Sequence, residues 1–506
     1  MSTLGEVPKS VISFLIMTRL VPCELGKVYR TNKHMMNIVK DMLKMVAKRF
    51  SLSILGDEKD GHFLFAAQIE HEETQLRGTC RYVYTFGNNS NGQVGDPKTW
   101  MSRSTPYLAF TSAPKTYVRE IACGAYHSMI LTTAGEVFSF GGNFCGQLGL
   151  QHIHKPDHRV ERIEVTVPLK IDTLEANVVH IAAGGYHSVF VHADGGVSAC
   201  GLAGAGQLGF LPQKGKGNQQ IPKPVQGLPL KFRAVQASAG SHQTVVLGSN
   251  GSVYVWGCTD HVKAGCKYCN YCTAGRCQLC LPDHCPREID GLEDQFAIQV
   301  AAANSMTAIL CANGELYTAG VSIVYGEEMD RWSAEEADIH MGRSREHDMH
   351  CFHASPVDMG ELWKQGHKVK HVAVGRKHTL MTTRSNKTVV FGHGKEGQLG
   401  NKSSKNVVDP TLLPSKLRTI RAACGEKHSA FITEEGRLLT CGENTYGQCG
   451  YDDDIQIHIS IPNGGPDIIM SKACQRQVPC VTNVHLVACG ETHTMLATSK
   501  EINHLV

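Results

Sequence analysis

One stretch decides the fold, residues 121–149, which read IACGAYHSMILTTAGEVFSFGGNFCGQLG. A Gly-x-x-His turn, from Gly124 to His127, is followed by an apolar run and a turn at Gly135. A second apolar run then ends at Phe140-Gly141, and the motif Gly-Gln-Leu-Gly closes the unit. Apolar runs of this length between glycine turns are typical of β-strands.

The Gly-x-x-His element recurs along the chain. Its glycine and histidine stand at residues 124/127, 184/187, 375/378, 425/428 and 490/493. We interpret Gly240-Ser241-His242 as a copy that is one residue shorter, and 303–306 as a copy that has lost both signature residues, which makes seven. The second apolar run also occurs seven times, with its final glycine at 87, 141, 201, 257, 320, 392 and 442.

The order of these elements at the two ends predicts a closed ring. The first repeat element in the chain is a run ending at Gly87, and the last is the run that follows Gly490. Each end is therefore half a unit, and pairing the halves completes one unit and removes an open sheet edge. We predict a mainly β fold, a seven-bladed β-propeller over residues 59–506 closed by N- and C-terminal strands, with a small N-terminal helical module.

The repeated unit resembles the repeat of the regulator of chromosome condensation (RCC) family, over about residues 80–498. The resemblance implies a propeller. It makes a guanine-nucleotide exchange factor for a Ran-type small GTPase one expected function, because the founding member of the family is one. Since the histidine recurs in almost every unit, we expect it to be structural and to hydrogen-bond the backbone of a neighbouring blade. The glutamine of Gly-Gln-Leu-Gly is expected to satisfy backbone groups of its own loop.

The composition and the motifs of the chain limit the classes of protein that it can belong to. The chain of 506 residues has no apolar run of the length that crosses a membrane, and we recognise no signal peptide at its start. We therefore expect a cytoplasmic or nuclear protein whose 20 cysteines are thiols or metal ligands rather than disulfides. No nucleophile–base constellation, P-loop or metalloprotease motif stands out, so we predict a binding protein without its own active site.

Residues 1–58 are predicted to be a separate helical module. The first 56 residues contain nine lysines and arginines but only three acidic residues, whereas the whole chain carries a net charge of only +3. Apolar residues at steps of three and four predict three short amphipathic helices. Because these helices bury little core alone, they need a partner surface.

This module resembles an F-box, with Val7-Pro8, paired apolar residues and a Pro22-x-Glu24-Leu25 step. Val7 replaces the usual opening leucine, and no tryptophan stands in the third helix. The resemblance implies docking on a Skp-type adaptor of a cullin ubiquitin ligase. The expected partner-binding residues are Pro8, Ile12, Leu15, Ile16, Leu20, Pro22, Leu25 and Val28. A helical extension packed on the propeller, or a basic segment that binds an acidic partner, are the alternatives.

The fourth unit carries a cysteine-rich insertion, residues 258–290, in place of Gly-Gln-Leu-Gly. C-x2-C pairs can supply the four thiolates of a structural zinc site, and metal binding would supply folding energy that few apolar residues can provide. An iron–sulfur cluster or plain reduced thiols are the alternatives. The expected ligands are Cys266, Cys269, Cys272, Cys277, Cys280 and Cys285.

The fifth unit carries a polar insertion, residues 326–360, with an acidic part followed by a basic, histidine-rich part. Long loops of this kind usually have a function. Because the two insertions are on neighbouring units, we predict that they decorate one side of the ring and form a partner-specific surface. Binding to nucleic acid is not expected.

Three functions follow from these patterns. The main prediction is a substrate-recognition (F-box) subunit of a cullin-type ubiquitin ligase, with the propeller as the protein-binding platform. The alternatives are an exchange factor for a Ran-type small GTPase and a non-enzymatic scaffold protein.

Overall fold

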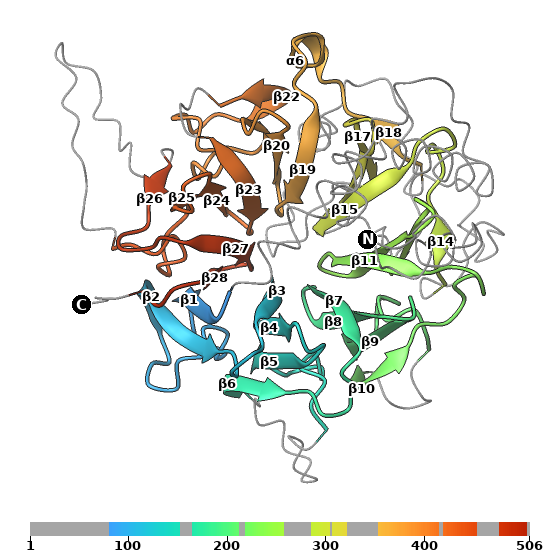
Figure 1. The fold of residues 1–506 in the computed structure, drawn as a ribbon. Helices are drawn as coiled ribbons and strands as arrows, with labels where there is room; N and C mark the ends of the chain where they lie inside the picture. Colours follow the sequence, from blue (N-terminus) through green and yellow to red (C-terminus); the bar gives the residue numbers. More distant parts are fainter. Residues whose placement is uncertain are drawn as a thin grey trace, which may run out of the picture.

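A computed structural model describes residues 80–151, 164–211, 218–257, 285–303, 306–320, 353–413, 418–452 and 475–502. These ranges form seven four-stranded antiparallel sheets arranged around a central axis (Figure 1). The prediction of a seven-bladed β-propeller is therefore confirmed. The predicted helical module at 1–58 lies outside the described residues.

Each blade has four strands, and the strand nearest the axis is named first. Blade 1 contains β27 (Val484–Cys489), β28 (His493–Thr498), β1 (Tyr82–Asn88) and β2 (Ser102–Thr111). Blade 2 contains β3 (Val118–Cys123), β4 (His127–Thr132), β5 (Val137–Gly142) and β6 (Glu164–Lys170). Blade 3 contains β7 (Val178–Ala183), β8 (His187–His192), β9 (Val197–Leu202) and β10 (Asn218–Pro224). Blade 4 contains β11 (Ala234–Ala239), β12 (Gln243–Gly248), β13 (Val253–Gly257) and β14 (Arg287–Glu288).

Blade 5 contains β15 (Ala297–Ala303), β16 (Met306–Cys311), β17 (Leu316–Gly320) and β18 (Ser355–Pro356). A short helix, α6 (Gly360–Lys364), leads to the next blade. Blade 6 contains β19 (Val369–Val374), β20 (His378–Thr383), β21 (Thr388–Gly392) and β22 (Val407–Leu412). Blade 7 contains β23 (Thr419–Cys424), β24 (His428–Thr433), β25 (Leu438–Gly442) and β26 (Arg476–Gln477).

Blade 1 closes the ring as predicted, because its inner strands come from one end of the repeat region and its outer strands from the other. In Figure 1, blue β1 lies against red β28. The two strands pair without a register shift, from Tyr82 opposite Thr498 to Gly87 opposite His493.

The up-and-down strand order places the connections on two faces. The Gly-x-x-His turns join each innermost strand to the second strand, and the third-to-fourth connections lie at the same end of the blades. We call this side the turn face. The hairpins between second and third strands, and the links from one blade to the next, lie on the opposite face.

A buried hydrogen-bonded relay joins neighbouring blades. Ser188 of blade 3 donates its hydroxyl proton to the carbonyl of Gln147 in blade 2 at 2.7 Å, and its oxygen lies 2.8 Å from Nε2 of His127 in blade 2. The same arrangement joins four further pairs of blades at 2.7–2.9 Å, through His493–Ser128–Gln93, His187–Thr244–Gln207, His378–Ser429–Gln398 and His428–Thr494–Gln448.

The relay also fixes the state of the histidines. A hydroxyl has one proton, and each of these hydroxyls donates it to a glutamine carbonyl, so Nε2 of the imidazole must be the donor to the hydroxyl oxygen. Burial lowers the pKa of His127, His187, His428 and His493 to about 3, so these rings are neutral at physiological pH. The expected structural role holds, although the partner is a side-chain hydroxyl rather than backbone.

Blades 4 and 5 depart from the relay. Strand β12 begins at Gln243, opposite Gly257, so Gln243 and not His242 occupies the histidine position, and the shortened copy predicted from the sequence is wrong. Gln243 donates its amide to the carbonyl of Met306 at 2.9 Å, which replaces the relay between blades 4 and 5. Blade 5 has Met306 at the position of the signature histidine. The Thr379 hydroxyl of blade 6, which would accept a hydrogen bond from a histidine at that position, has no hydrogen-bond partner among the described residues.

A different contact joins blades 5 and 6. The side-chain amide of Gln299 in β15 donates to the carbonyl of Val372 in β19, and its oxygen accepts from the Val372 N–H, both at 3.0 Å. The two blades without a complete signature are thus each joined to the next blade by a glutamine side chain, Gln243 on the second strand of blade 4 and Gln299 on the innermost strand of blade 5.

Glycine is required at the signature positions because neighbouring blades approach each other too closely there for a side chain. A Cβ added to Gly124 would lie 2.4 Å from the carbonyl oxygen of Gly184 in the next blade and 2.5 Å from the His127 ring. The hydrophobic clusters are shared in the same way: Val83 of blade 1 packs with Ile130 and Phe140 of blade 2. The core therefore lies between blades rather than within them.

Three outermost strands, β14, β18 and β26, are only two residues long. Each follows a third-to-fourth connection that lies outside the described residues, at 258–284, 321–352 and 453–474. The described strand ends beside all three are on the turn face. Residues 285–290 and 353–360, which were predicted to belong to the two insertions, instead contribute β14 and β18 to their blades.

We expect acidification to destabilise the ring. Four buried histidines have a pKa of about 3 against the ordinary 6.5. Between these values the unfolded chain binds protons that the folded chain does not, so stability is fully present above pH 6.5 and falls with pH below it, by up to about 1.4 kcal/mol per pH unit for each histidine. The melting temperature should fall steadily from pH 7 to pH 5. A flat profile over this range would contradict the account.

The relay also predicts that replacing a threonine by valine destabilises the protein at one inter-blade position and has little effect at the equivalent position of another blade. Thr494→Val removes the partner of both His428 and Gln448 and should lower the free energy of unfolding by about 1–3 kcal/mol. Thr379→Val removes a hydroxyl without a described partner and should be close to neutral. Denaturant unfolding of both variants is the measurement, and equal losses would show that the relay does not join the blades.

Candidate functional site

Most of the site residues predicted from the sequence lie outside the described residues. This holds for Pro8, Ile12, Leu15, Ile16, Leu20, Pro22, Leu25 and Val28, and for Cys266, Cys269, Cys272, Cys277 and Cys280. Cys285 is described and is a partly buried free thiol. In the described ranges, no group of His, Cys, Asp and Glu side chains is arranged to hold a metal ion, and no helix is long and apolar enough to cross a membrane.

The innermost strands surround the central axis, and the Gly-x-x-His turns encircle that axis on the turn face (Figure 1). We call this ring of turns the mouth. The first variable residue of each turn differs systematically around the ring. Blades 2, 3 and 4 have Ala125, Gly185 and Ser241 there, whereas blades 6, 7 and 1 have Arg376, Glu426 and Glu491. One half of the mouth therefore carries small residues, and the other half carries acidic and basic ones.

The ionic half is a compact triad from three consecutive blades. The guanidinium of Arg376 hydrogen-bonds the carboxylate of Glu426 and lies 3.7 Å from that of Glu491. Burial raises the pKa of Glu491, the neighbouring Glu426 raises it further, and Arg376 and Lys427 act against both. One arginine thus lies between two carboxylates at the centre of the face.

Aromatic side chains lie beside this triad. The rings of Tyr126 and Tyr186, the second variable residues in blades 2 and 3, have centroids 5.0 Å apart, and Phe144 meets Tyr126 edge-on at 6.0 Å. Burial raises the pKa of Tyr126, as do its hydrogen bond with Tyr186 and the nearby carboxylates of Glu491 and Glu426. The mouth therefore combines packed aromatic rings with acidic and basic side chains.

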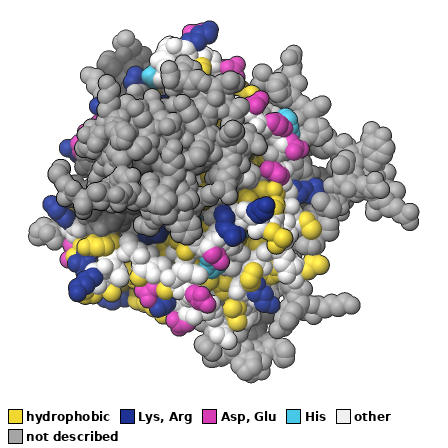
Figure 2. Space-filling model, turned by 45° about the vertical axis from the view of Figure 1, so that its right-hand side comes forward, with side chains coloured by type: hydrophobic (Ala, Val, Ile, Leu, Met, Phe, Trp, Pro, Cys, Tyr) yellow, Lys and Arg dark blue, Asp and Glu magenta, His cyan; other side chains and the backbone are white. Residues whose placement is uncertain are grey.

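The outer connections of the same face expose large apolar side chains. Trp100 and Met101 of blade 1 are 65% and 77% exposed, and Leu211 of blade 3 is 71% exposed. Phe144 and Tyr446 are partly exposed on blades 2 and 7. On the side drawn in Figure 2, hydrophobic side chains lie among acidic and basic ones. A centre of aromatic and charged groups with apolar residues around it is typical of a protein–protein interface.

This arrangement suits binding rather than proton transfer. The histidines nearest the mouth are fully buried and hold neutral imidazoles in the inter-blade relay. Sequence reasoning did not identify Tyr126, Tyr186, Arg376, Glu426 or Glu491. The available signal was their position, since they are the two variable residues inside each otherwise repeated Gly-x-x-His turn.

Comparison with known sequences identifies the repeats. The model of the Regulator of chromosome condensation (RCC1) repeat matches residues 82–131, 134–191, 194–247, 390–432 and 435–497. A second model of the same repeat matches residues 118–147, 178–207 and 420–448. The first set alone covers more than half of the chain.

Two curated relatives and one solved structure illustrate the range of similar proteins. The Secretion-regulating guanine nucleotide exchange factor of Mus musculus is 25% identical over 432 residues, 82% of this chain and 82% of that protein. E3 ubiquitin-protein ligase HERC2 of Mus musculus is 28% identical over 361 residues, 69% of this chain but only 6% of that protein. Prp20p of Saccharomyces cerevisiae, whose structure was described with its binding to Gsp1p and histones, superposes with a TM-score of 0.63 at 18% identity, covering 86% of this chain and 95% of that one.

These relatives overturn the main functional prediction, that of an F-box subunit of a cullin-type ubiquitin ligase. The Secretion-regulating guanine nucleotide exchange factor matches this chain along 82% of its own length. The match to a ubiquitin ligase spans 6% of that enzyme and gives no support for an adaptor role. The prediction failed because it was carried by residues 1–58, a short segment whose apolar spacing suits many amphipathic helices.

Proposed function

The chain belongs to the regulator of chromosome condensation (RCC1) repeat family, and on that basis we propose that it is a guanine-nucleotide exchange factor for a Ran-type small GTPase. It would act as a binding platform without an active site of its own, in the cytoplasm or the nucleus. The exchange factor that matches along four-fifths of both proteins supports this proposal.

The proposal rests mainly on the side chains at the mouth, the ring of turns around the axis on the turn face. Exchange requires no covalent chemistry, because a protein that binds the nucleotide-free GTPase more tightly than the loaded one shifts the equilibrium towards release. A rigid ring with aromatic and charged side chains at its centre provides such a surface. Tyr126 and Tyr186 supply contact area, and Arg376, Glu426 and Glu491 supply orientation.

The two carboxylates suggest how the binding of the nucleotide to the GTPase would be weakened. A GTPase holds its nucleotide phosphates with a P-loop lysine and a Mg²⁺ ion. Within the triad, two carboxylates lie against one guanidinium, so the triad itself carries an excess of negative charge that can attract a lysine of the partner. In this proposal they compete with the phosphates for that cation once the GTPase is docked.

The test is nucleotide release from a Ran-type GTPase loaded with fluorescent GDP, with the full chain added in catalytic amounts. We expect release to accelerate by about tenfold or more, which corresponds to about 1.4 kcal/mol off the barrier. The double substitution Tyr126→Ala with Glu491→Ala should remove most of the acceleration.

The matched control is Glu434→Ala, which removes a carboxylate from the opposite face, where it pairs with Arg418. This variant should retain full activity. Unchanged release with the wild-type chain across Ran-type GTPases would overturn the proposed function. Loss of activity in both variants would show that the turn face is not the docking surface.

We also propose that the cysteine-rich segment binds structural zinc. The spacing of Cys266, Cys269, Cys272, Cys277, Cys280 and Cys285 supports this, because thiolates two residues apart can share one ion. Elemental analysis of the chain purified under reducing conditions should find one or two zinc ions per molecule. Cys277→Ser with Cys280→Ser should lower that content, whereas Cys480→Ser, an exposed free thiol elsewhere, should not. Iron in place of zinc, or no metal, would contradict the proposal.

A further inference from the structure

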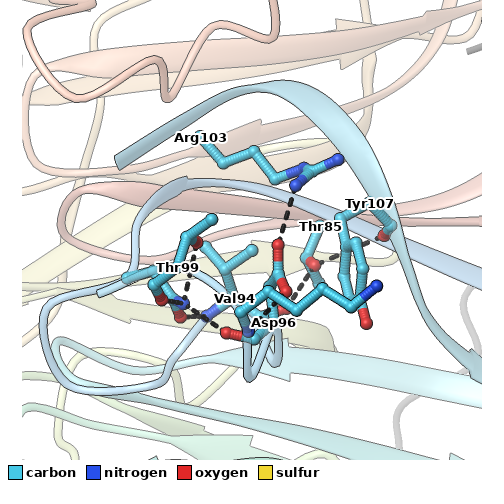
Figure 3. A network of polar contacts seen from close by, with 8 residues as sticks. Thr85, Val94, Asp96, Thr99, Arg103 and Tyr107 are labelled. Atoms are coloured by element: carbon cyan, nitrogen blue, oxygen red, sulfur yellow. Dashed lines mark hydrogen bonds and ion pairs between the residues drawn. The ribbon is translucent and has the colours of Figure 1, made fainter. Parts of the chain in front are cut away.

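The connection between β1 and β2 is braced by an ion pair between a buried carboxylate and a partly exposed arginine. The carboxylate of Asp96, which is 1% exposed, lies 2.7 Å from the Arg103 guanidinium, and that guanidinium lies over the Tyr107 ring at 5.0 Å (Figure 3). The other Asp96 oxygen accepts the backbone N–H of Lys98 at 2.9 Å. Both oxygens of the Asp96 carboxylate therefore hold the loop in place.

Asn89 binds the same loop from inside. Its side-chain amide donates to the carbonyls of Asp96 and Thr99 at 2.9 and 2.6 Å, and its side-chain oxygen accepts the N–H of Val94 at 2.9 Å. Its backbone N–H donates to the carbonyl of Met101 at 3.1 Å. The loop is thus fixed through its start, middle and end.

The result of this bracing is a rigid apolar tip. Trp100 and Met101 are adjacent and mostly exposed, although their backbone is held in place. The corresponding connection of blade 6 instead exposes three lysines, Lys395, Lys402 and Lys405. A large rigid aromatic side chain on an ordered loop is the kind of residue that dominates binding energy, because little conformational freedom remains to be lost.

The base of this loop is joined to the turn that carries Glu491 of the triad. The N–H of Asn88, where the loop begins, donates to the carbonyl of Thr492 at 2.9 Å, and Thr492 follows Glu491 of the ionic triad. On the other side, Ser104 hydrogen-bonds Asp452 of blade 7, and Tyr446 lies partly exposed in the same blade. Glu491 and the tip therefore belong to the same face of blade 1, where one partner can contact both.

We propose that Trp100 and Met101 are a preformed anchor that enters an apolar pocket on the GTPase, and that this anchor sets the lifetime of the complex. The proposal rests on the proposed function. Two apolar side chains on one loop are too few for stable attachment to a membrane. Asp96 acts as a positioning residue, since it touches the loop and not the partner.

The experiment measures association and dissociation rates of the full chain with the nucleotide-free Ran-type GTPase. Trp100→Ala with Met101→Ala should weaken binding about 30-fold or more, mainly through faster dissociation. Asp96→Asn should mainly slow association, because the loop must then order on binding. The matched control is Leu230→Ala, which truncates a 98% exposed leucine on the opposite face and should change neither rate.

The outcomes separate the two proposals. If the wild-type chain binds and releases nucleotide but the Trp100/Met101 variant binds equally well, the anchor is overturned and the exchange function stands. If the wild-type chain does not bind the GTPase, both fail. Loss of self-association or of vesicle binding in the double variant, with GTPase binding intact, would assign the tip to a second copy or a membrane and would also overturn the anchor. Equal melting temperatures of all variants show that folding is unaffected.

Discussion

A hydroxyl group buried between blades has one proton to donate and one oxygen to offer, and in five of the seven junctions both are used. The proton goes to the carbonyl of a Gly-Gln-φ-Gly loop, and the oxygen accepts the N–H of a Gly-x-x-His histidine. Because the two motifs of one blade meet the same hydroxyl of the next, each blade is positioned by its neighbour. The close glycine contacts and the shared hydrophobic clusters depend on this spacing.

The relay leaves particular positions free. In the turns that keep the signature, the glycine and histidine are committed to the junction, but the two residues between them lie at the mouth, around the central axis. There the chain has Tyr126 and Tyr186 on one side and Arg376, Glu426 and Glu491 on the other. The proposed interface is thus built from the variable residues of a repeated turn, on a face that also includes the braced Trp100 loop and the described ends of three long connections.

The fold could be predicted because its determinants repeat. Seven copies of a glycine-ended strand and a half-unit at each end indicate a closed ring without knowledge of any contact. The assignment of His242 failed because the position is defined by the pairing of Gln243 with Gly257, which spacing alone does not give. The site could not be predicted for a related reason: Arg376, Glu426 and Glu491 are 50 or more residues apart and meet only after the ring closes. Repetition marks the residues that hold the ring together, whereas the residues at the mouth differ from one blade to the next.

Hydrogen exchange of the full chain, alone and with the nucleotide-free GTPase, tests the central claim that the turn face is the working surface of this ring. We expect slower exchange at residues 124–126, 490–492 and 98–103 in the complex, and no change at the opposite-face turns 133–136 and 227–233. Protection confined to the opposite face, or spread equally over both, would contradict it.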